Sequence, residues 1–300
     1  MQVRLERFSK FRLGSLWMLV AGLLFAGMGV FVKLGGAHFS SAEMVFYRSI
    51  FGVVMVLSVM HFKRLAVRTP HWRLHVGRSV AGFGGMMLLF YVIGILPLST
   101  ATTLNYTSPL FMVVLSTLVL RRRPQPWLVV AVVLGFVGVV LLLQPSFGAG
   151  QTVAGLLGLA SGLCASVAYL TTTELGRLGE PAWRIVLYFA AVSTLGAAIF
   201  ALAGGGFRPI DRESLLVLLG LGLSATLGQL AMTRAYADGE TLTVGSLAYS
   251  TVVFTTLLSI LIWRDAVSIT SWLAITLIIA SGVLATRITA EAAPAAAPPA

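Results

Sequence analysis

Ten long apolar segments follow one another along this 300-residue chain, and they constrain its fold more than any other feature. A helix needs ~20 predominantly apolar residues to cross the ~30 Å hydrocarbon core of a bilayer, and each segment has about that length. The sequence therefore predicts an all-α polytopic membrane protein with ten transmembrane helices. The segments are 13–34, 42–61, 74–95, 99–120, 126–143, 153–174, 183–203, 214–235, 241–262 and 268–286.

The composition agrees with a chain whose main solvent is lipid. Hydrophobic residues make up 58% of it and charged residues 10%, whereas about 25% of the residues of a soluble domain are charged. The first apolar run continues to Leu34, too long for a signal peptide and without an Ala-x-Ala cleavage site, so a retained first helix follows a short segment 1–13. The alanine- and proline-rich residues 289–300 are expected to form a disordered tail.

The lysines and arginines predict the orientation of the chain. With the N-terminus in the cytoplasm, 15 of the 21 basic residues fall in cytoplasmic segments and 4 in outer segments, and Arg48 and Arg78 lie within helices. The positive-inside rule then places both termini in the cytoplasm. We expect the protein in the inner membrane. This bias also explains the net charge of +11 as topology and leaves little reason to expect nucleic acid as a partner.

An internal repeat divides the chain into two halves. A displacement of 143 residues lays 98–123 on 241–266 with eight identities in 26 positions, including the pair Tyr106 and Tyr249. We expect one repeat over 14–145 and another over 150–288, with five helices each. An odd number of helices inverts the second copy, and inverted repeats recur in secondary transporters, whose sites lie near the bilayer midplane.

The start of the fourth segment is unusually polar for a transmembrane helix. Pro109 has no N–H, so the carbonyl of Asn105 loses its partner within the helix. At membrane depth such a carbonyl is tolerated only against protein or water, so Thr102, Asn105, Tyr106 and Pro109 are expected to line a substrate cavity. The alternative is hydrogen bonding between helices by the serines and threonines.

The repeat places a matching set in the ninth segment. Gly245, Ser246 and Tyr249 are expected to line the opposite wall of the cavity. Val252 stands where the first half has its proline, so the kink is expected to be one-sided.

Charged side chains inside a bilayer are costly and are treated as functional candidates. Arg48 lies deepest, about a third of the way across the second segment, and either binds a carboxylate or phosphate of the substrate or serves a structural role by snorkelling or ion pairing. Arg78, Glu174 and Arg234 lie near cytoplasmic helix ends, as interfacial ion pairs or as an inner gate. Glu43 lies at the outer rim.

Only Glu43 and Glu174 are acidic residues within the predicted spans, which makes them the candidates for proton coupling. Neither is deep, so coupling through a buried carboxylate has weak support.

Gly82, Gly84 and Gly85 cluster within one turn of the third segment, where they either permit close helix packing or form a hinge.

Several other classes of protein have no signature here. The chain lacks the glycine-rich loop of ATP-hydrolysing modules and the H-E-x-x-H motif, and its histidines lie in or beside loops. Cys164 is the single cysteine, which excludes internal disulfides and cysteine-based metal sites. No metal, cofactor or enzymatic activity is expected, although a lipid-processing enzyme, an assembly scaffold and a channel stay as alternatives.

The stretch that begins at Arg78, RSVAGFGGMMLLFYVIGILPLSTATTLNYTSPLFMVVLSTLVL, resembles the EamA branch of the drug/metabolite transporter superfamily. The resemblance extends over about residues 14–288. It implies ten helices, two inverted repeats, cytoplasmic termini and a central cavity. One departure is clear: where relatives usually carry a Gly-Glu pair at the ends of the fourth and ninth helices, this chain has Arg121-Arg122 and Arg264-Asp265.

The resemblance also implies a function. Relatives move amino acids, nucleotide-like metabolites, vitamins and metal-chelating metabolites. We therefore expect a carrier of a small polar or amphipathic metabolite, with export favoured over uptake, whose partners are its small-molecule substrate and the lipid bilayer. The oligomeric state is not predicted.

Overall fold

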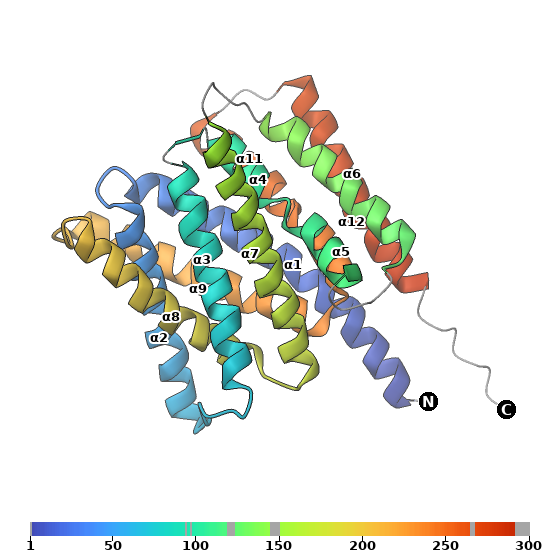
Figure 1. Cartoon of the computed structure of the whole chain (residues 1–300), viewed down its shortest axis with the longest axis horizontal. Helices are drawn as coiled ribbons and strands as arrows, with labels where there is room; N and C mark the ends of the chain where they lie inside the picture. The colour runs from blue at the N-terminus through green and yellow to red at the C-terminus, as the bar shows by residue number, and fades with distance from the viewer. Residues whose placement is uncertain are drawn as a thin grey trace.

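A computed structural model describes residues 2–93, 95–96, 98–118, 124–144, 151–264 and 268–291, and helices dominate this part of the chain (Figure 1). Within these ranges no strand occurs, which confirms the expected all-α fold. The helices are α1 (Gln2–Gly35), α2 (Ser41–Lys63), α3 (Trp72–Ile93), α4 (Leu98–Asn105), α5 (Ser108–Leu118), α6 (Pro126–Leu143), α7 (Thr152–Arg177), α8 (Ala182–Ala203), α9 (Arg212–Asp238), α10 (Thr241–Ala248), α11 (Ser250–Trp263) and α12 (Ile269–Glu291).

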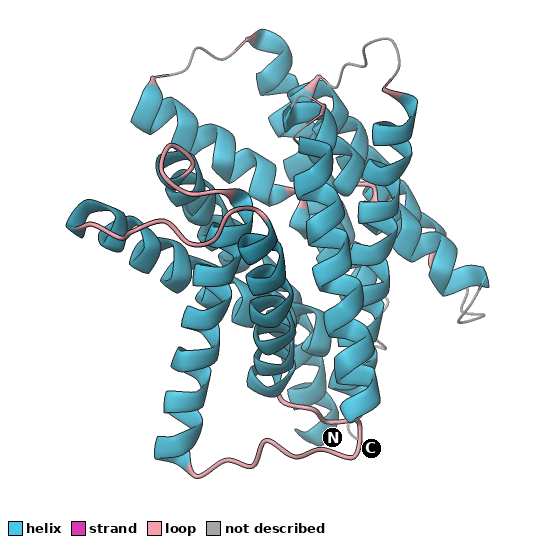
Figure 2. Ribbon diagram, turned by 60° about the vertical axis from the view of Figure 1, so that its left-hand side comes forward, coloured by secondary structure: helices cyan, strands magenta, loops and turns pink. Residues whose placement is uncertain are grey.

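The twelve helices form the ten expected spans, because α4 with α5 and α10 with α11 each make up one span. On the described residues, eight spans are long and apolar enough to cross a membrane. The loops that the structure describes between consecutive helices have no more than eight residues (Figure 2). The protein is therefore a multi-pass membrane protein.

Both polar spans contain a break in their regular helical hydrogen bonding, and the expectation of a one-sided kink stays a prediction. Between α4 and α5, the N–H of Thr107 donates to the carbonyl of Leu104 (3.2 Å), three residues back instead of four. Between α10 and α11, the N–H of Tyr249 donates to Ser246 in the same way (3.3 Å). This tighter turn needs no proline. In the second half the Tyr249 ring is fully buried against Gly135 of α6, and this packing accompanies the break.

The helix contacts follow the inverted repeat. The most extensive ones join helices of different halves: α1 with α9, α3 with α7, α2 with α8 and α6 with α12. The first two pairs are equivalent, since each joins the first span of one half to the third span of the other. The last two pairs join equivalent spans, as on a pseudo-twofold axis. Figure 1 shows α3 beside α7 and α6 beside α12.

The two ends of the bundle differ in their loops. The end where α1 begins, here called the terminal end, holds the loops 64–71, 178–181 and 239–240; the far end holds 36–40 and 204–211. At the far end, side chains cap the first turns of α2 and α9. Ser40 and Glu43 form a reciprocal capping box at α2, and the Asp211 carboxylate accepts from the N–H of Ser214 (2.7 Å) at α9.

Some predictions fall outside the described residues, namely Arg121, Arg122, Asp265 and residues 292–300. The helix α12 continues to Glu291, three residues into the range expected as a disordered tail. The sequence offers a reason, since the first helix-breaking proline is Pro294. The repeat boundaries at 14–145 and 150–288 stay a prediction.

Candidate functional site

A small cavity lies inside the bundle, between helices of both halves. Its volume is about 160 Å³, and side chains from α1, α2, α3, α4, α7, α8 and α9 line it. A smaller cavity of about 20 Å³ shares three of its lining residues. The lining is largely apolar. Its polar members are Arg48, Arg78, Asn105, Tyr169 and Gln229.

Arg48 lies in α2, seven residues after the helix begins, and lines both cavities. Its Nη1 lies 3.7 Å from the sulfur of Met28, which is only a weak acceptor. No ion pair between described residues includes Arg48. A structural role of Arg48 through an ion pair is thus not supported by the described part of the chain.

Arg78 lies in α3 and is only 2% exposed. Its Nε donates to the hydroxyl of Thr172 (3.2 Å), and its guanidinium lies over the ring of Phe189 at 4.3 Å, a cation–π contact. The Nη1 nitrogen is buried and has no hydrogen-bond partner among the described residues. These contacts fix the guanidinium from two sides and leave an N–H donor free at the cavity.

Two amides complete the polar lining. Asn105 ends α4, and its Nδ2 donates to the hydroxyl of Ser161 in α7 (3.1 Å). Gln229 of α9 is 5% exposed and lines both cavities, and in the described part of the chain its Nε2 has no hydrogen-bond partner. Asn105 thus lines the cavity, and its role in substrate binding stays a prediction. Gln229 was not among the predicted site residues.

The other candidates of the two polar spans lie outside this cavity. Pro109 packs against Gly245, where an added Cβ would lie 3.2 Å from the proline Cβ. Ser246 shares a hydrogen bond of 2.6 Å with Ser281 of α12. Thr102 is partly buried in α4 and is not among the lining residues. The predicted roles of these residues in substrate binding stay predictions, and packing between helices already accounts for their burial.

Four tyrosines form two ring contacts, and one of them, Tyr169, lines the cavity. Tyr169 stacks on Tyr236 with ring centroids 4.7 Å apart, and Tyr106 meets Tyr249 at 6.0 Å. The hydroxyls of Tyr236 and Tyr249 are buried without a hydrogen-bond partner. Tyr106 and Tyr249, the residues that mark the internal repeat, therefore meet at the interface of the two halves.

The three glycines of α3 have different surroundings. A Cβ on Gly85 would lie 3.0 Å from the Cβ of Cys164 in α7, and one on Gly82 would lie 3.1 Å from the ring of Phe189 in α8. A Cβ on Gly84 would meet nothing within 4 Å. Gly82 and Gly85 thus allow close helix packing, while Gly84 has open space around it.

The three residues considered for an inner gate line three different pockets. Arg78 lines the central cavity, and the other two lie near the terminal end. Glu174 lies 3.5 Å from Arg177, and Arg234 lies 3.5 Å from Asp238. The first pair lies within α7 and the second within α9, and about half of each side chain is exposed. Each pair is therefore expected to contribute little to stability.

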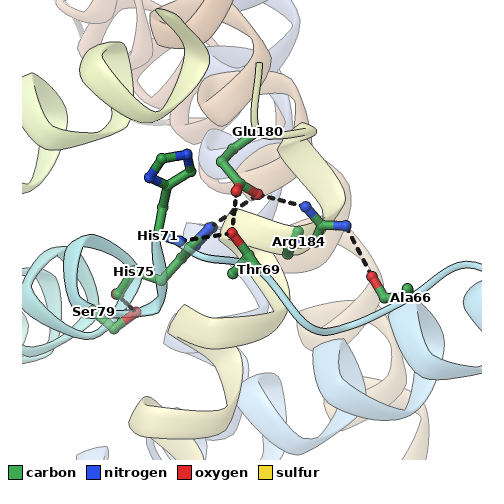
Figure 3. A network of polar contacts seen from close by, with 7 residues as sticks. All are labelled: Ala66, Thr69, His71, His75, Ser79, Glu180 and Arg184. Carbon is green, nitrogen blue, oxygen red and sulfur yellow. Dashed lines mark hydrogen bonds and ion pairs between the residues drawn. The ribbon is translucent and has the colours of Figure 1, made fainter. Parts of the chain in front are cut away.

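A buried polar network at the terminal end was not predicted from the sequence (Figure 3). Glu180 in the loop before α8 accepts hydrogen bonds from Thr69 and from Nη1 of Arg184 (2.7 Å). Its carboxylate also lies 3.2 Å from Nε2 of His75, whose side chain is fully buried and stacks on Tyr188. Arg184 in turn donates to the carbonyl of Ala66 (2.9 Å). The network ties the α2–α3 loop to the α7–α8 loop.

Glu43 makes a similar connection at the far end. It is 1% exposed, and besides capping α2 it accepts a hydrogen bond from the backbone N–H of Arg208 in the α8–α9 loop (2.7 Å). The Arg208 side chain donates to the carbonyl of His38 (2.7 Å). These contacts assign Glu43 a structural task, and its role in proton coupling stays a prediction.

Comparisons with known proteins agree with this architecture. The model of the EamA-like transporter family matches residues 12–144 and 152–287. The pseudopaline exporter CntI of Pseudomonas aeruginosa is 30% identical over 84% of this chain and 88% of its own. The riboflavin transporter of Rhizobium johnstonii is 31% identical over 76% and 75%. A protein crystal structure that is 21% identical covers 93% of this chain and 98% of its own with a TM-score of 0.82, a likeness of fold.

Proposed function

Because this chain belongs to the EamA-like transporter family, we propose that it carries a small polar or amphipathic metabolite across the inner membrane by alternating access. Export is favoured over uptake, and the terminal end faces the cytoplasm. The family and the named relatives are transporters, which supports the general activity. The substrate and the direction belong to the proposal.

The cavity between the two halves carries this proposal. Helices of both repeats enclose it, as expected for a site around which two similar halves rock. Its polar groups are few and converge from different helices, and its remaining lining is apolar, a combination that suits a small ligand with polar and apolar parts. Of the residues predicted to bind the substrate, Arg48 and Asn105 line it, and Arg78, predicted for an inner gate, lines it as well.

Transport is tested with the purified full-length protein in liposomes. The panel consists of amino acids, nucleosides and vitamins, each measured in both directions. Saturable flux of at least one compound is expected. Faster movement from the terminal end to the far end than in the reverse direction supports export. Flux that never saturates indicates a channel, and no flux of any compound contradicts the proposal.

Arg48→Ala separates a binding role from a structural one. A hydrogen bond to a charged group contributes ~1.5–3 kcal/mol, so the loss of the Arg48 guanidinium is expected to lower flux at least about tenfold. The variant protein is expected to stay monodisperse. Arg212→Ala serves as the control, because Arg212 is exposed at the start of α9. An Arg48→Ala protein that fails to fold would instead support a structural role for this arginine.

A further inference from the structure

The central cavity contains two arginines that enter it from opposite depths. Arg48 lies seven residues from the start of α2 and Arg78 six residues from the start of α3. These neighbouring spans are antiparallel, so the two starts lie at opposite ends of the bundle. At 1.5 Å per residue, each Cα lies ~10 Å from its own end of a ~30 Å span, which leaves about 10 Å between them along the membrane normal.

No acidic residue balances these charges in the described part of the chain. Neither cavity has an aspartate or glutamate in its lining, and no described ion pair includes Arg48 or Arg78. A buried arginine without a counter-charge is costly at membrane depth, and two in one cavity also repel each other. An anionic ligand would remove both penalties.

Two buried hydrogen-bond donors of the cavity have no partner among the described residues. Nη1 of Arg78 and Nε2 of Gln229 are buried without partners, and both side chains are at least nine-tenths buried. Among the described residues, the hydrogen-bond partner of Arg48 is the sulfur of Met28, a weak acceptor. Carboxylates accept hydrogen bonds and donate none when ionised, so they match this lining.

We propose that the cavity binds a small dicarboxylate, with one carboxylate at Arg48 and the other at Arg78. The inference rests on the proposed transport function and names its substrate class. Gln229, which lines the cavity with both arginines, donates to the bound compound. The volume of about 160 Å³ is below the ~300–1,000 Å³ of sites for drug-sized ligands, so the compound is small.

Binding is measured on the full-length protein in detergent, by calorimetry and by the ligand-induced rise in unfolding temperature. The probes are the unbranched dicarboxylates from malonate to adipate, each with the monocarboxylate and the neutral diamide of the same length. At least one dicarboxylate is expected to bind at least tenfold more tightly than its two analogues. A series in which no dicarboxylate exceeds its monocarboxylate overturns the proposal.

Variants locate the two carboxylates. Arg48→Gln and Arg78→Gln are each expected to weaken dicarboxylate binding about 10- to 100-fold, while the monocarboxylate responds to only one of them. Arg212→Gln is the control. Unchanged binding in either cavity variant overturns the proposal. Where a Gln variant does not fold, the Lys variant replaces it. The Lys variant is expected to weaken dicarboxylate binding more than monocarboxylate binding. Equal weakening of both ligands overturns the two-carboxylate site.

The same protein in liposomes distinguishes this inference from the general function. Saturable flux of an uncharged or zwitterionic compound, without dicarboxylate binding, would retain the transporter and overturn the dicarboxylate site. Dicarboxylate binding without flux of any dicarboxylate would retain the site and overturn transport of its ligand.

Discussion

At the scale of single residues, Glu180 shows how a loop carboxylate becomes part of the interior. It is 6% exposed, and burial raises its pKa. The hydrogen bonds from Thr69 and Arg184 and the neighbouring His75 outweigh burial, so the pKa of Glu180 lies below its ordinary value of 4.5. Folding therefore favours the ionised form of this carboxyl group.

This pKa shift predicts a pH-dependent contribution to stability. Because the folded pKa is lowered, the contribution is fully present above the unfolded pKa and is lost as the pH falls through the folded value. At neutral pH, Glu180→Gln is expected to lower the free energy of unfolding by ~1–3 kcal/mol, and this difference should vanish in acid. Unfolding temperatures measured between about pH 3 and 7 provide the check.

The control for Glu180→Gln is Glu213→Gln, because Glu213 is exposed in the first turn of α9. It should change the unfolding temperature little at any pH. A Glu180→Gln protein whose deficit persists unchanged in acid would show that the ionised carboxylate is not the stabilising species.

The two kinds of buried charge differ in how far the sequence predicts them. Arg48 and Arg78 stand inside apolar runs, so their location within spans was readable from the sequence. Glu180 precedes a proline in a loop, and its partner Thr69 lies 111 residues away. Such a pairing depends on how the two halves pack, which hydropathy does not report.

At the scale of helices, the packing of α3 against α7 depends on a glycine without a side chain. Gly85 approaches the backbone of Ser161, whose carbonyl would lie 3.1 Å from an added Cβ. Gly84, the preceding residue, has open space. The pair therefore separates the effect of packing from the general effect of removing a glycine from a helix.

Gly85→Ala is expected to lower the free energy of unfolding by ~1–3 kcal/mol, since the added methyl group forces α3 and α7 apart. Gly84→Ala should cause no loss and gain up to ~1 kcal/mol from helix propensity. Thermal unfolding of the two variants in detergent tests both values. Equal effects would mean that Gly85 contributes flexibility and not close packing.

The helices themselves were predictable and their breaks only in part. Apolar runs of spanning length located all ten spans, because a helix that crosses the hydrocarbon core of the bilayer needs ~20 predominantly apolar residues. Pro109 indicated the break between α4 and α5. The break at Tyr249 has no such local sign, because it accompanies the packing of that ring against Gly135 in another helix.

At the scale of the whole molecule, each end of the bundle has a buried carboxylate that joins the two halves. Glu43 of the first half binds the backbone of Arg208 at the far end. Glu180 of the second half binds Thr69 at the terminal end. Both connections are made in this structure, and the cavity lies between them. The repeat predicted the two halves, but not these contacts.

The orientation of the molecule is tested with single cysteines in a Cys164→Ala background. Leu65 in the α2–α3 loop is 38% exposed at the terminal end, and Ile210 in the α8–α9 loop is 46% exposed at the far end. In intact cells a membrane-impermeant maleimide is expected to label Ile210→Cys, and Leu65→Cys only after the inner membrane is permeabilised. The reverse pattern would invert the proposed topology.

The two arginines of the cavity both belong to the first half. At the displacement of 143 residues they correspond to Ala191 and Leu221, so only the first of the two halves contributes arginines to the cavity. Any movement of α2 and α3 along the membrane normal then carries two positive charges through the membrane potential, at up to ~2.3 kcal/mol per charge for each 100 mV. A bound dicarboxylate cancels both charges. The voltage would therefore act on the return of the empty carrier and leave the loaded step almost untouched.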